Sequence, residues 1–165
     1  MANEAYPSVN DTECSWADIK IAAQVDGGTL VDMADVAAVK DSRSVEVGKK
    51  RGASGGRVMS QTAGEGDQEA SITFYRGGLR RLKKALMAKA PTRGNQVIIG
   101  RVPFDVTIQW TPLGEDEIYE RIWKGCRFLG DAEDNGEGSD PDQVEVTLNP
   151  IEIADIIDGK EVVLI

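Results

Sequence analysis

The sequence contains no histidine. Histidine is the most frequent general base in enzymes and the most frequent metal ligand, so its absence weighs against triad chemistry and a transition-metal centre. No Ser, Cys or Lys nucleophile stands near a recognisable base in the remaining sequence. We therefore expect no catalytic residue, no metal and no cofactor, and a protein that is not an enzyme.

Cysteines and long apolar runs are also scarce. The two cysteines, Cys14 and Cys126, form no CxxC pair, and we expect reduced thiols in a cytoplasmic product. The longest apolar runs, such as residues 85–88, fall far short of the roughly 20 residues that cross a bilayer. The first residues have neither the basic start nor the apolar core of a signal peptide. The sequence thus predicts synthesis in the cytoplasm and no membrane partner.

The charge balance is acidic. The chain has 165 residues, a formal net charge of −9 and 41% hydrophobic residues. This length and apolar content predict one folded domain, residues 1–165. A free-standing nucleic-acid binder needs a basic face, whereas this chain as a whole repels phosphate.

Alternating apolar and polar residues predict a β-rich chain with about seven strands. The predicted strands are 15–23, 36–47, 69–75, 97–110, 118–129, 144–148 and 151–157. Pro103 inside one of them suggests an edge strand or a bulge. The apolar stripe of Leu79, Leu82 and Leu86 predicts one helix, residues 79–89, with its basic residues on the other faces.

Two segments have no core pattern. Residues 1–14 are polar and suggest an arm. Residues 48–66 hold six glycines and four basic residues, which predicts a long loop, either mobile or ordered by contact with a partner. This loop does not match a nucleotide-binding motif, and the acidic segment 131–142 matches a calcium loop only in part.

The predicted strand 118–129 carries apolar residues on both faces. One face holds Ile118, Ile122, Cys126 and Phe128, and the other holds Tyr119, Trp123 and Leu129. A domain of this size readily buries only one face of such a strand. The face with Tyr119 and Trp123 is therefore a candidate interface.

The order of these elements resembles that of bacteriophage tail tube proteins and, more distantly, of the tube proteins of type VI secretion systems. The resemblance covers about residues 15–157. It rests on the early strand, loop 48–66, the strand that leads directly into helix 79–89, and the segments 123–128 and 142–148 on either side of an acidic loop.

This resemblance implies a mostly β (α+β) fold, an antiparallel β-sandwich or barrel with one flanking helix and a long extended loop. It implies that six copies close into a ring through one continuous inner barrel and that rings stack into a tail tube. Loop 48–66 and arm 1–14 would reach between rings. The virion tail would be the location, and genomic DNA would pass through the lumen without specific binding.

The implied partners are the chain itself and the tape measure, baseplate and terminator proteins, with a sheath if the tail is contractile. Charge complementarity adds a hypothesis about subunit contacts. Lys49, Lys50, Arg51 and Arg57 of one subunit would meet Asp131, Glu133, Asp134 and Glu137 of another. The alternative function is a monomeric or small-oligomer β-barrel that binds a ligand or a partner protein.

Overall fold

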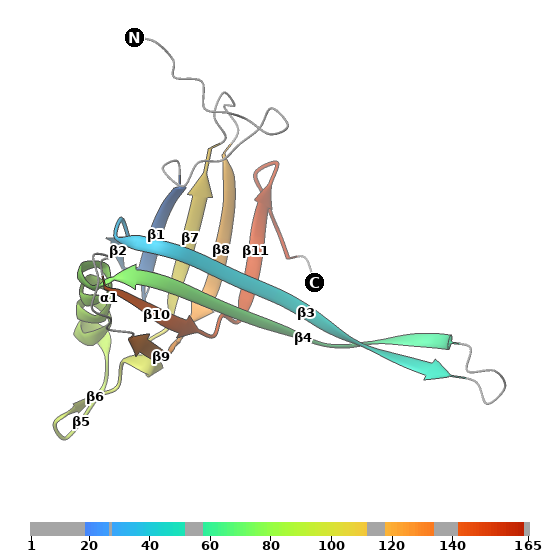
Figure 1. Cartoon of the computed structure of the whole chain (residues 1–165), viewed down its shortest axis with the longest axis horizontal. Coiled ribbons are helices and arrows are strands. Elements are labelled where there is room, and N and C mark those ends of the chain that lie inside the picture. Colours follow the sequence, from blue (N-terminus) through green and yellow to red (C-terminus); the bar gives the residue numbers. More distant parts are fainter. Residues whose placement is uncertain (1–18, 27, 52–57, 112–117, 134–141, 164–165) are drawn as a thin grey trace, which may run out of the picture.

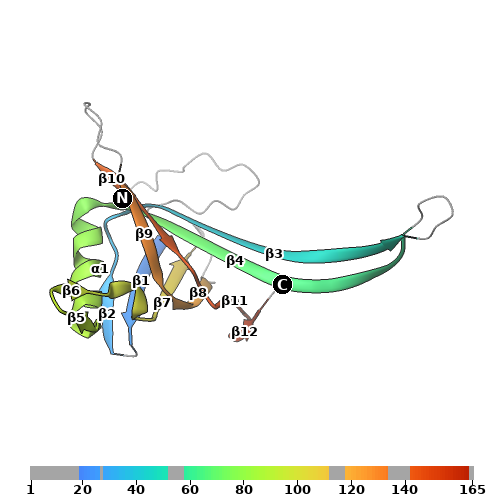
Figure 2. The same cartoon turned by 90° about the horizontal axis from the view of Figure 1, so that it is seen from below.

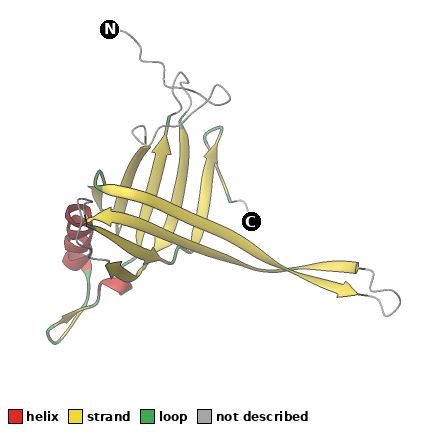
Figure 3. Ribbon diagram, in the orientation of Figure 1, coloured by secondary structure: helices red, strands yellow, loops and turns green. Residues whose placement is uncertain are grey.

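The computed structural model describes residues 19–26, 28–51, 58–111, 118–133 and 142–163. Within these residues, two antiparallel sheets form a sandwich with an α-helix at one side (Figures 1 and 3). The prediction of a mostly β chain with a flanking helix is confirmed.

The larger sheet has six strands in the order β12-β11-β8-β7-β1-β2. They are β1 (Ile19–Val25), β2 (Thr29–Asp32), β7 (Phe104–Trp110), β8 (Tyr119–Cys126), β11 (Glu152–Ile157) and β12 (Lys160–Val162). The smaller sheet has four strands in the order β3-β4-β10-β9. They are β3 (Val36–Arg51), β4 (Val58–Tyr75), β9 (Phe128–Glu133) and β10 (Gln143–Leu148). The helix is α1 (Arg76–Lys89), and β5 (Thr92–Arg93) and β6 (Gln96–Val97) form a separate hairpin.

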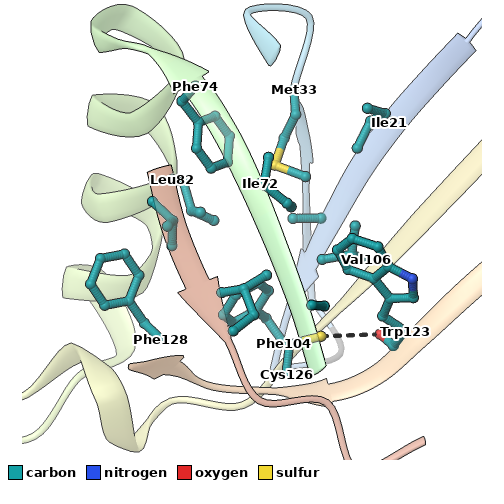
Figure 4. Close-up of a cluster of buried hydrophobic side chains, with 14 of the residues drawn as sticks. Ile21, Met33, Ile72, Phe74, Leu82, Phe104, Val106, Trp123, Cys126 and Phe128 are labelled. Carbon is teal, nitrogen blue, oxygen red and sulfur yellow. Dashed lines mark hydrogen bonds between the residues drawn. The ribbon is translucent and has the colours of Figure 1, made fainter. Parts of the chain in front are cut away.

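The core lies between the two sheets, and α1 covers one side of it (Figure 4). Strands β1 and β10 show the predicted alternation, with Ile21, Ala23 and Val25 inward on β1 and Val144 and Val146 inward on β10. The largest fully buried side chains include Trp123, Phe74, Phe104, Ile72, Leu82 and Leu86. Each buried side chain of this kind contributes about 1.5–3 kcal/mol of hydrophobic stabilisation.

Helix α1 buries the predicted stripe of Leu79, Leu82 and Leu86. It begins at Arg76, three residues earlier than predicted, so that Gly78 lies inside its first turn. Because Gly78 has no Cβ, the turn can approach the backbone of Asp35 closely: a Cβ there would lie 2.8 Å from the carbonyl oxygen.

The predicted strand 118–129 is in fact two strands in different sheets, so its predicted faces are partly wrong. Strands β8 and β9 meet at Arg127, which exchanges two backbone hydrogen bonds with Asn149. Gly125 has φ 60°, and this irregularity breaks the alternation. Trp123 and Cys126 consequently both point into the core, and Trp123 is 0% exposed. Trp123 is a core residue and not part of an exposed aromatic face.

The predicted loop 48–66 is also wrong in its secondary structure. Strands β3 and β4 pair from Val36↔Phe74 out to Arg51↔Val58, so residues 48–51 and 58–66 form an antiparallel ribbon. The ribbon runs across the six-stranded sheet and then projects well beyond it (Figures 1 and 2). Alternation failed as a signal here because the projecting part has no core against which to bury one face.

The predicted strand 97–110 is shorter than expected. Val97 belongs to the short strand β6, and the long strand of this region is only Phe104–Trp110. Pro103 lies just before β7, outside the strand, and β7 lies between β1 and β8 and is not an edge. Neither alternative that Pro103 suggested therefore applies. The register of β7 with β8 does shift between Phe104 and Val106, but the additional residue lies on β8, between Trp123 and Cys126.

Candidate assembly surfaces

The projecting part of the β3–β4 ribbon is the most unusual surface of the molecule. We call residues 45–51 and 58–66 the distal ribbon, and Figure 2 shows it leading away from the sandwich. On its β3 strand, residues 46–51 are all exposed, including Val47 at 49%. An isolated two-stranded ribbon is marginally stable in water. The distal ribbon therefore has the character of an element that another surface completes.

The end of this ribbon on β3 is basic. Lys49, Lys50 and Arg51 are consecutive and exposed. Their cross-strand partners on β4 are Gln61, Ser60 and Val58, so no carboxylate lies opposite. No ion pair to these three cations is present among the described residues. They are therefore available to an anionic surface of another molecule. Arg57, the fourth predicted cation, lies outside the described residues.

At the base of the distal ribbon, four side chains form a continuous ion-pair network. Arg121 on β8 donates through Nε to Asp155 Oδ1 on β11 at 2.6 Å. Its Nη1 donates to Asp41 on β3, at 2.8 Å to Oδ2 and 3.1 Å to Oδ1. Arg43 Nη2 on β3 donates to Asp155 Oδ2 at 3.0 Å. The network joins the ribbon to the six-stranded sheet.

The network is partly shielded from water. Side-chain exposure is 19% for Arg43, 15% for Asp155, 27% for Arg121 and 18% for Asp41. Burial by itself would raise the pKa of Asp155, but hydrogen bonds and charges from Arg121 and Arg43 outweigh it and hold that pKa below its ordinary value. Burial by itself would lower the pKa of Arg121, but hydrogen bonds and charges from Asp155 and Asp41 outweigh it and raise that pKa above its ordinary value. Each charge is thus compensated by partners of opposite sign.

The sequence does carry a signal for this network, although the predicted site residues do not include it. Arg121 lies two residues before Trp123, and Asp155 lies two residues after Ile153, so both occupy inward positions of their strands. Asp41 and Arg43 share one face of β3. A charged residue at an inward strand position indicates either that it forms a buried ion pair or that the strand is wrongly assigned. Here charges of opposite sign occur at inward positions of different strands, which favours ion pairs.

The predicted acidic contact residues already have partners within the subunit. Asp131 lies 2.5 Å from Lys83 Nζ, and Glu133 lies 2.5 Å from Arg76 Nη2. These pairs bind α1 to the β9 end of the smaller sheet. Asp134 and Glu137 lie outside the described residues. A lysine or arginine of a neighbouring subunit would have to share Asp131 with Lys83, or Glu133 with Arg76, or displace that partner. The intersubunit contact stays a prediction.

Tyr119 is the part of the predicted aromatic surface that is exposed. It is 39% exposed and stacks on Trp110, with ring centroids 6.3 Å apart. Trp110 is the opposite residue on β7. Tyr119 therefore remains a contact candidate, whereas Trp123 does not.

The outer face of the six-stranded sheet carries polar and charged side chains together with apolar ones such as Leu30, which is 69% exposed. Residues that pair across the sheet share this face, such as Lys20, Gln109 and Glu120. Its charged members are Lys20, Asp32, Asp105, Glu120, Lys124, Glu152 and Glu161. With five carboxylates and two lysines the face carries a net negative charge.

The two edges of this sheet are short strands. Edge strand β2 has four residues and edge strand β12 has three. Strand β12 pairs only with residues 155–157 of β11, so residues 152–154 of β11 pair with β8 alone among the described strands. Unpaired strand backbone of this kind is a template for pairing with another chain.

The described residues contain no group of three or more His, Cys, Asp or Glu side chains arranged to hold a metal ion. Cys126 is buried and its thiol is free. No described helix combines the length and the apolar character needed to span a bilayer.

Solved structures with the same fold come from tubes and injection machines. One is a chain of the anti-feeding prophage baseplate, 6-fold symmetrised, with a TM-score of 0.60 and 10% identity over 94% of this chain and 99% of that chain. Another belongs to the sheath–tube complex of an extracellular contractile injection system, PVC, with a TM-score of 0.56 and 13% identity over 96% and 95%. A third is the SPP1 tail tube, with a TM-score of 0.61 and 12% identity over 89% and 82%.

No protein-family model and no curated protein sequence matches the chain. At 10–13% identity, the structural likeness establishes the fold. The fold is that of phage tail tubes and of contractile injection tubes, which confirms the resemblance in the order of elements. The three structures are a baseplate, a sheath–tube complex and a tail tube.

Proposed function

We propose that this chain, which has the tail tube fold, is a structural virion protein that polymerises as stacked hexameric rings into a phage tail tube. The genome would pass through the tube during delivery. The distal ribbon is the observation that carries the proposal. A projecting antiparallel ribbon whose residues 46–51 are all exposed has no function in an isolated sandwich, but it fits a subunit that is completed by copies of itself.

Ring closure would use the edges of the six-stranded sheet. Pairing of β2 of one copy beside β11 and β12 of the next would join the sheets into one barrel and leave no edge exposed. Among the described strands, residues 152–154 of β11 pair only with β8, which supports this arrangement.

The lumen would then be lined by the outer face of the six-stranded sheet. The charged side chains of this face include more carboxylates than lysines, while the opposite face is buried in the core. A weakly negative wall does not attract phosphate, so DNA could slide along it without sticking.

Stacking of rings would use the distal ribbon, together with arm 1–14. The remaining tail partners follow from the proposed role: tape measure, baseplate and terminator proteins, and a sheath if the tail is contractile. The tail of the virion would be the location, after synthesis in the host cytoplasm.

Electron microscopy of the purified full chain tests the proposal. We expect rings or tubes of uniform diameter. A matched variant replaces residues 46–65 by Asn-Gly, which joins the cross-strand pair Val45↔Gly66 through a two-residue hairpin turn. This variant should keep its fold, seen by circular dichroism and cooperative unfolding, but form no tubes.

Dispersed small particles of the unmodified chain, at every concentration and salt condition tried, would contradict the proposal. They would favour a monomeric or small-oligomer binding domain. If the shortened variant forms tubes equally well, the tube function stands, but the distal ribbon is not needed for assembly.

A further inference from the structure

Apolar contact between the ribbon and the sandwich ends near residue 39. Val39 packs against the core, and Ala70, across from Asp41, is the last buried apolar residue on β4 before the ribbon leaves. The next inward positions on β3 are Asp41 and Arg43. Both point at the six-stranded sheet and contact Arg121 and Asp155 there. Charged contacts are thus the last ones before the distal ribbon begins.

The base of the ribbon is partly buried from solvent as well as charged. Gln68 lies opposite Arg43 on β4. Its side-chain oxygen Oε1 is buried and accepts no hydrogen bond from the described residues. Ion pairs in such a partly dry setting are screened less by salt than exposed pairs, so they hold their geometry more firmly.

The geometry of Arg121 makes the network directional. Its guanidinium donates from Nε to Asp155 and from Nη1 to both oxygens of Asp41. A planar donor that contacts two carboxylates from two strands fixes the rotation of one strand against the other. Arg43 closes the network from the ribbon back to Asp155.

A small rotation at this base has a large effect at the tip. Residues 45–51 extend about 20 Å at about 3.3 Å per residue. A rotation of about 15° at the base would therefore move Arg51 by about 5 Å, which is as large as the spacing between neighbouring strands. The direction of the ribbon must be set at its base, since its end projects away from the other described elements (Figure 1).

We propose that Arg121 and Asp155 are positioning residues that hold the distal ribbon at a fixed angle to the sandwich in the free subunit. The ribbon tip is thereby placed for a second copy of the chain before that copy arrives. This inference deepens the proposed tube function and rests on it for the identity of the partner. The fixed angle itself is a property of the free subunit.

Distance measurement between two spin labels tests the fixed angle. The labels are attached at Lys50→Cys on the ribbon and Lys84→Cys on α1, both exposed positions, in a Cys14→Ser background. Cys126 is buried and stays unlabelled. The protein is kept dilute so that it remains unassembled. We expect a narrow distance distribution for the otherwise unmodified chain.

The Asp155→Asn variant should broaden this distribution by about 5 Å, which is the displacement of Arg51 that a rotation of about 15° at the base would produce. The control variant Lys83→Met removes an ion pair of α1 with Asp131, away from the ribbon base, and should leave the distribution narrow. An unchanged distribution in Asp155→Asn, or equal broadening in both variants, overturns the inference.

The double variant Arg121→Met/Asp41→Leu separates positioning from stability. It replaces both partners of one partly buried ion pair by apolar side chains, which is often neutral or stabilising, whereas Arg121→Met alone would leave Asp41 without its arginine. Asp155 keeps its contact with Arg43 in this variant. We expect unfolding by urea to be little changed while the distance distribution broadens. A narrow distribution in the double variant would overturn the inference.

Micrographs of the same proteins at assembly concentration keep the two proposals apart. Slower tube formation by Asp155→Asn than by Lys83→Met supports the positioning role. If the unmodified chain forms no tubes but shows the narrow distribution that Asp155→Asn broadens, the tube function fails and the fixed angle stands.

Discussion

Cys126 lies in the core beside Trp123, whose carbonyl oxygen is 3.6 Å from its Sγ. Burial, with a further contribution from the charge of Asp105, raises the pKa of Cys126 to about 12. Only the thiolate reacts with disulfide reagents, so we expect the thiol in a Cys14→Ser protein to be inert in the native state near pH 8. Ellman's reagent should detect one thiol at once in concentrated guanidinium. Fast reaction of the native protein would contradict the buried position.

Asp155 makes stability depend on pH in a defined direction. Its folded-state pKa lies below the ordinary value of 3.8, so the folded protein binds this proton less readily than the unfolded chain. The stabilisation is therefore complete above about pH 4 and is lost as pH falls through the lowered pKa. Urea unfolding between about pH 6 and 2.5 should show a steeper loss for the unmodified chain than for Asp155→Asn. Parallel curves would show that Asp155 gains nothing from its two arginines.

The side chains near Gly125 were only partly predictable from the sequence. The alternation of apolar residues correctly placed Cys126 and Phe128 inward. It placed Trp123 outward, because nothing in the sequence indicated that Gly125 adopts φ 60° and shifts the register by one position. Ile151 covers this glycine, with its Cδ1 2.7 Å from where a Cβ would lie. Such a tertiary contact becomes visible only in the fold.

Helix α1 was predictable because its apolar stripe repeats at helical spacing, whereas its first turn was not. Its N-terminal residues are Arg76 and two glycines, with no side-chain cap and no acidic residue in the first turn, so the usual start signals are missing. Tertiary contacts take their place. Arg76 pairs with Glu133 and Asp142, and Arg81 pairs with Asp35.

The two glycines in this turn should respond oppositely to alanine. A Cβ at Gly78 would lie 2.8 Å from the Asp35 carbonyl oxygen, so Gly78→Ala must push the helix from the sheet, and we expect a loss of about 1–3 kcal/mol. A Cβ at Gly77 would lie 3.5 Å from Asp35 Oδ2, an ordinary contact. Gly77→Ala should be neutral or gain up to about 1 kcal/mol from helix propensity. Urea unfolding measures both, and equal effects would contradict the close approach.

The secondary structure of the distal ribbon was predicted wrongly for a different reason. Half-buried strands are recognised by alternation, but residues 46–51 of β3 are all exposed and show none. Its glycines and cations read as a loop. The inward charges at Asp41, Arg43, Arg121 and Asp155 were visible in the sequence, but their pairing depends on the ribbon crossing the other sheet. The predicted strand 36–47 already contained Asp41 and Arg43, but its continuation into a ribbon that crosses the other sheet was not predicted.

At the scale of the whole molecule, charge is distributed unevenly. The chain carries a net charge of −9, yet Lys49, Lys50 and Arg51 form a basic group at the end of the distal ribbon. Copies of an acidic subunit repel one another, and this repulsion must be overcome locally for a tube to form. A basic group placed on a long projection can reach the acidic surface of a neighbouring copy while the acidic bodies stay apart.

This distribution predicts that tube assembly depends on salt through the ribbon end. Each exposed pair contributes about 0–1 kcal/mol, so the effect arises because every subunit in every ring repeats it. Salt also screens the general repulsion between acidic subunits, which favours assembly. We therefore expect the Lys49→Gln/Lys50→Gln/Arg51→Gln variant to assemble more slowly than the unmodified chain at low salt. The two should converge at high salt, as followed by light scattering and micrographs.

The control removes the same charge elsewhere. Lys89→Gln/Arg93→Gln/Arg101→Gln changes the net charge by the same amount at exposed positions away from the ribbon. If only net repulsion matters, both triple variants assemble equally slowly at low salt. If the ribbon end docks on carboxylates of a neighbouring copy, the ribbon variant is slower than this control at the same net charge. Reversal of the three ribbon charges to Glu should then deepen the defect, and tubes that form as fast as those of the control would rule out the electrostatic contact while leaving the ribbon backbone as the connecting element.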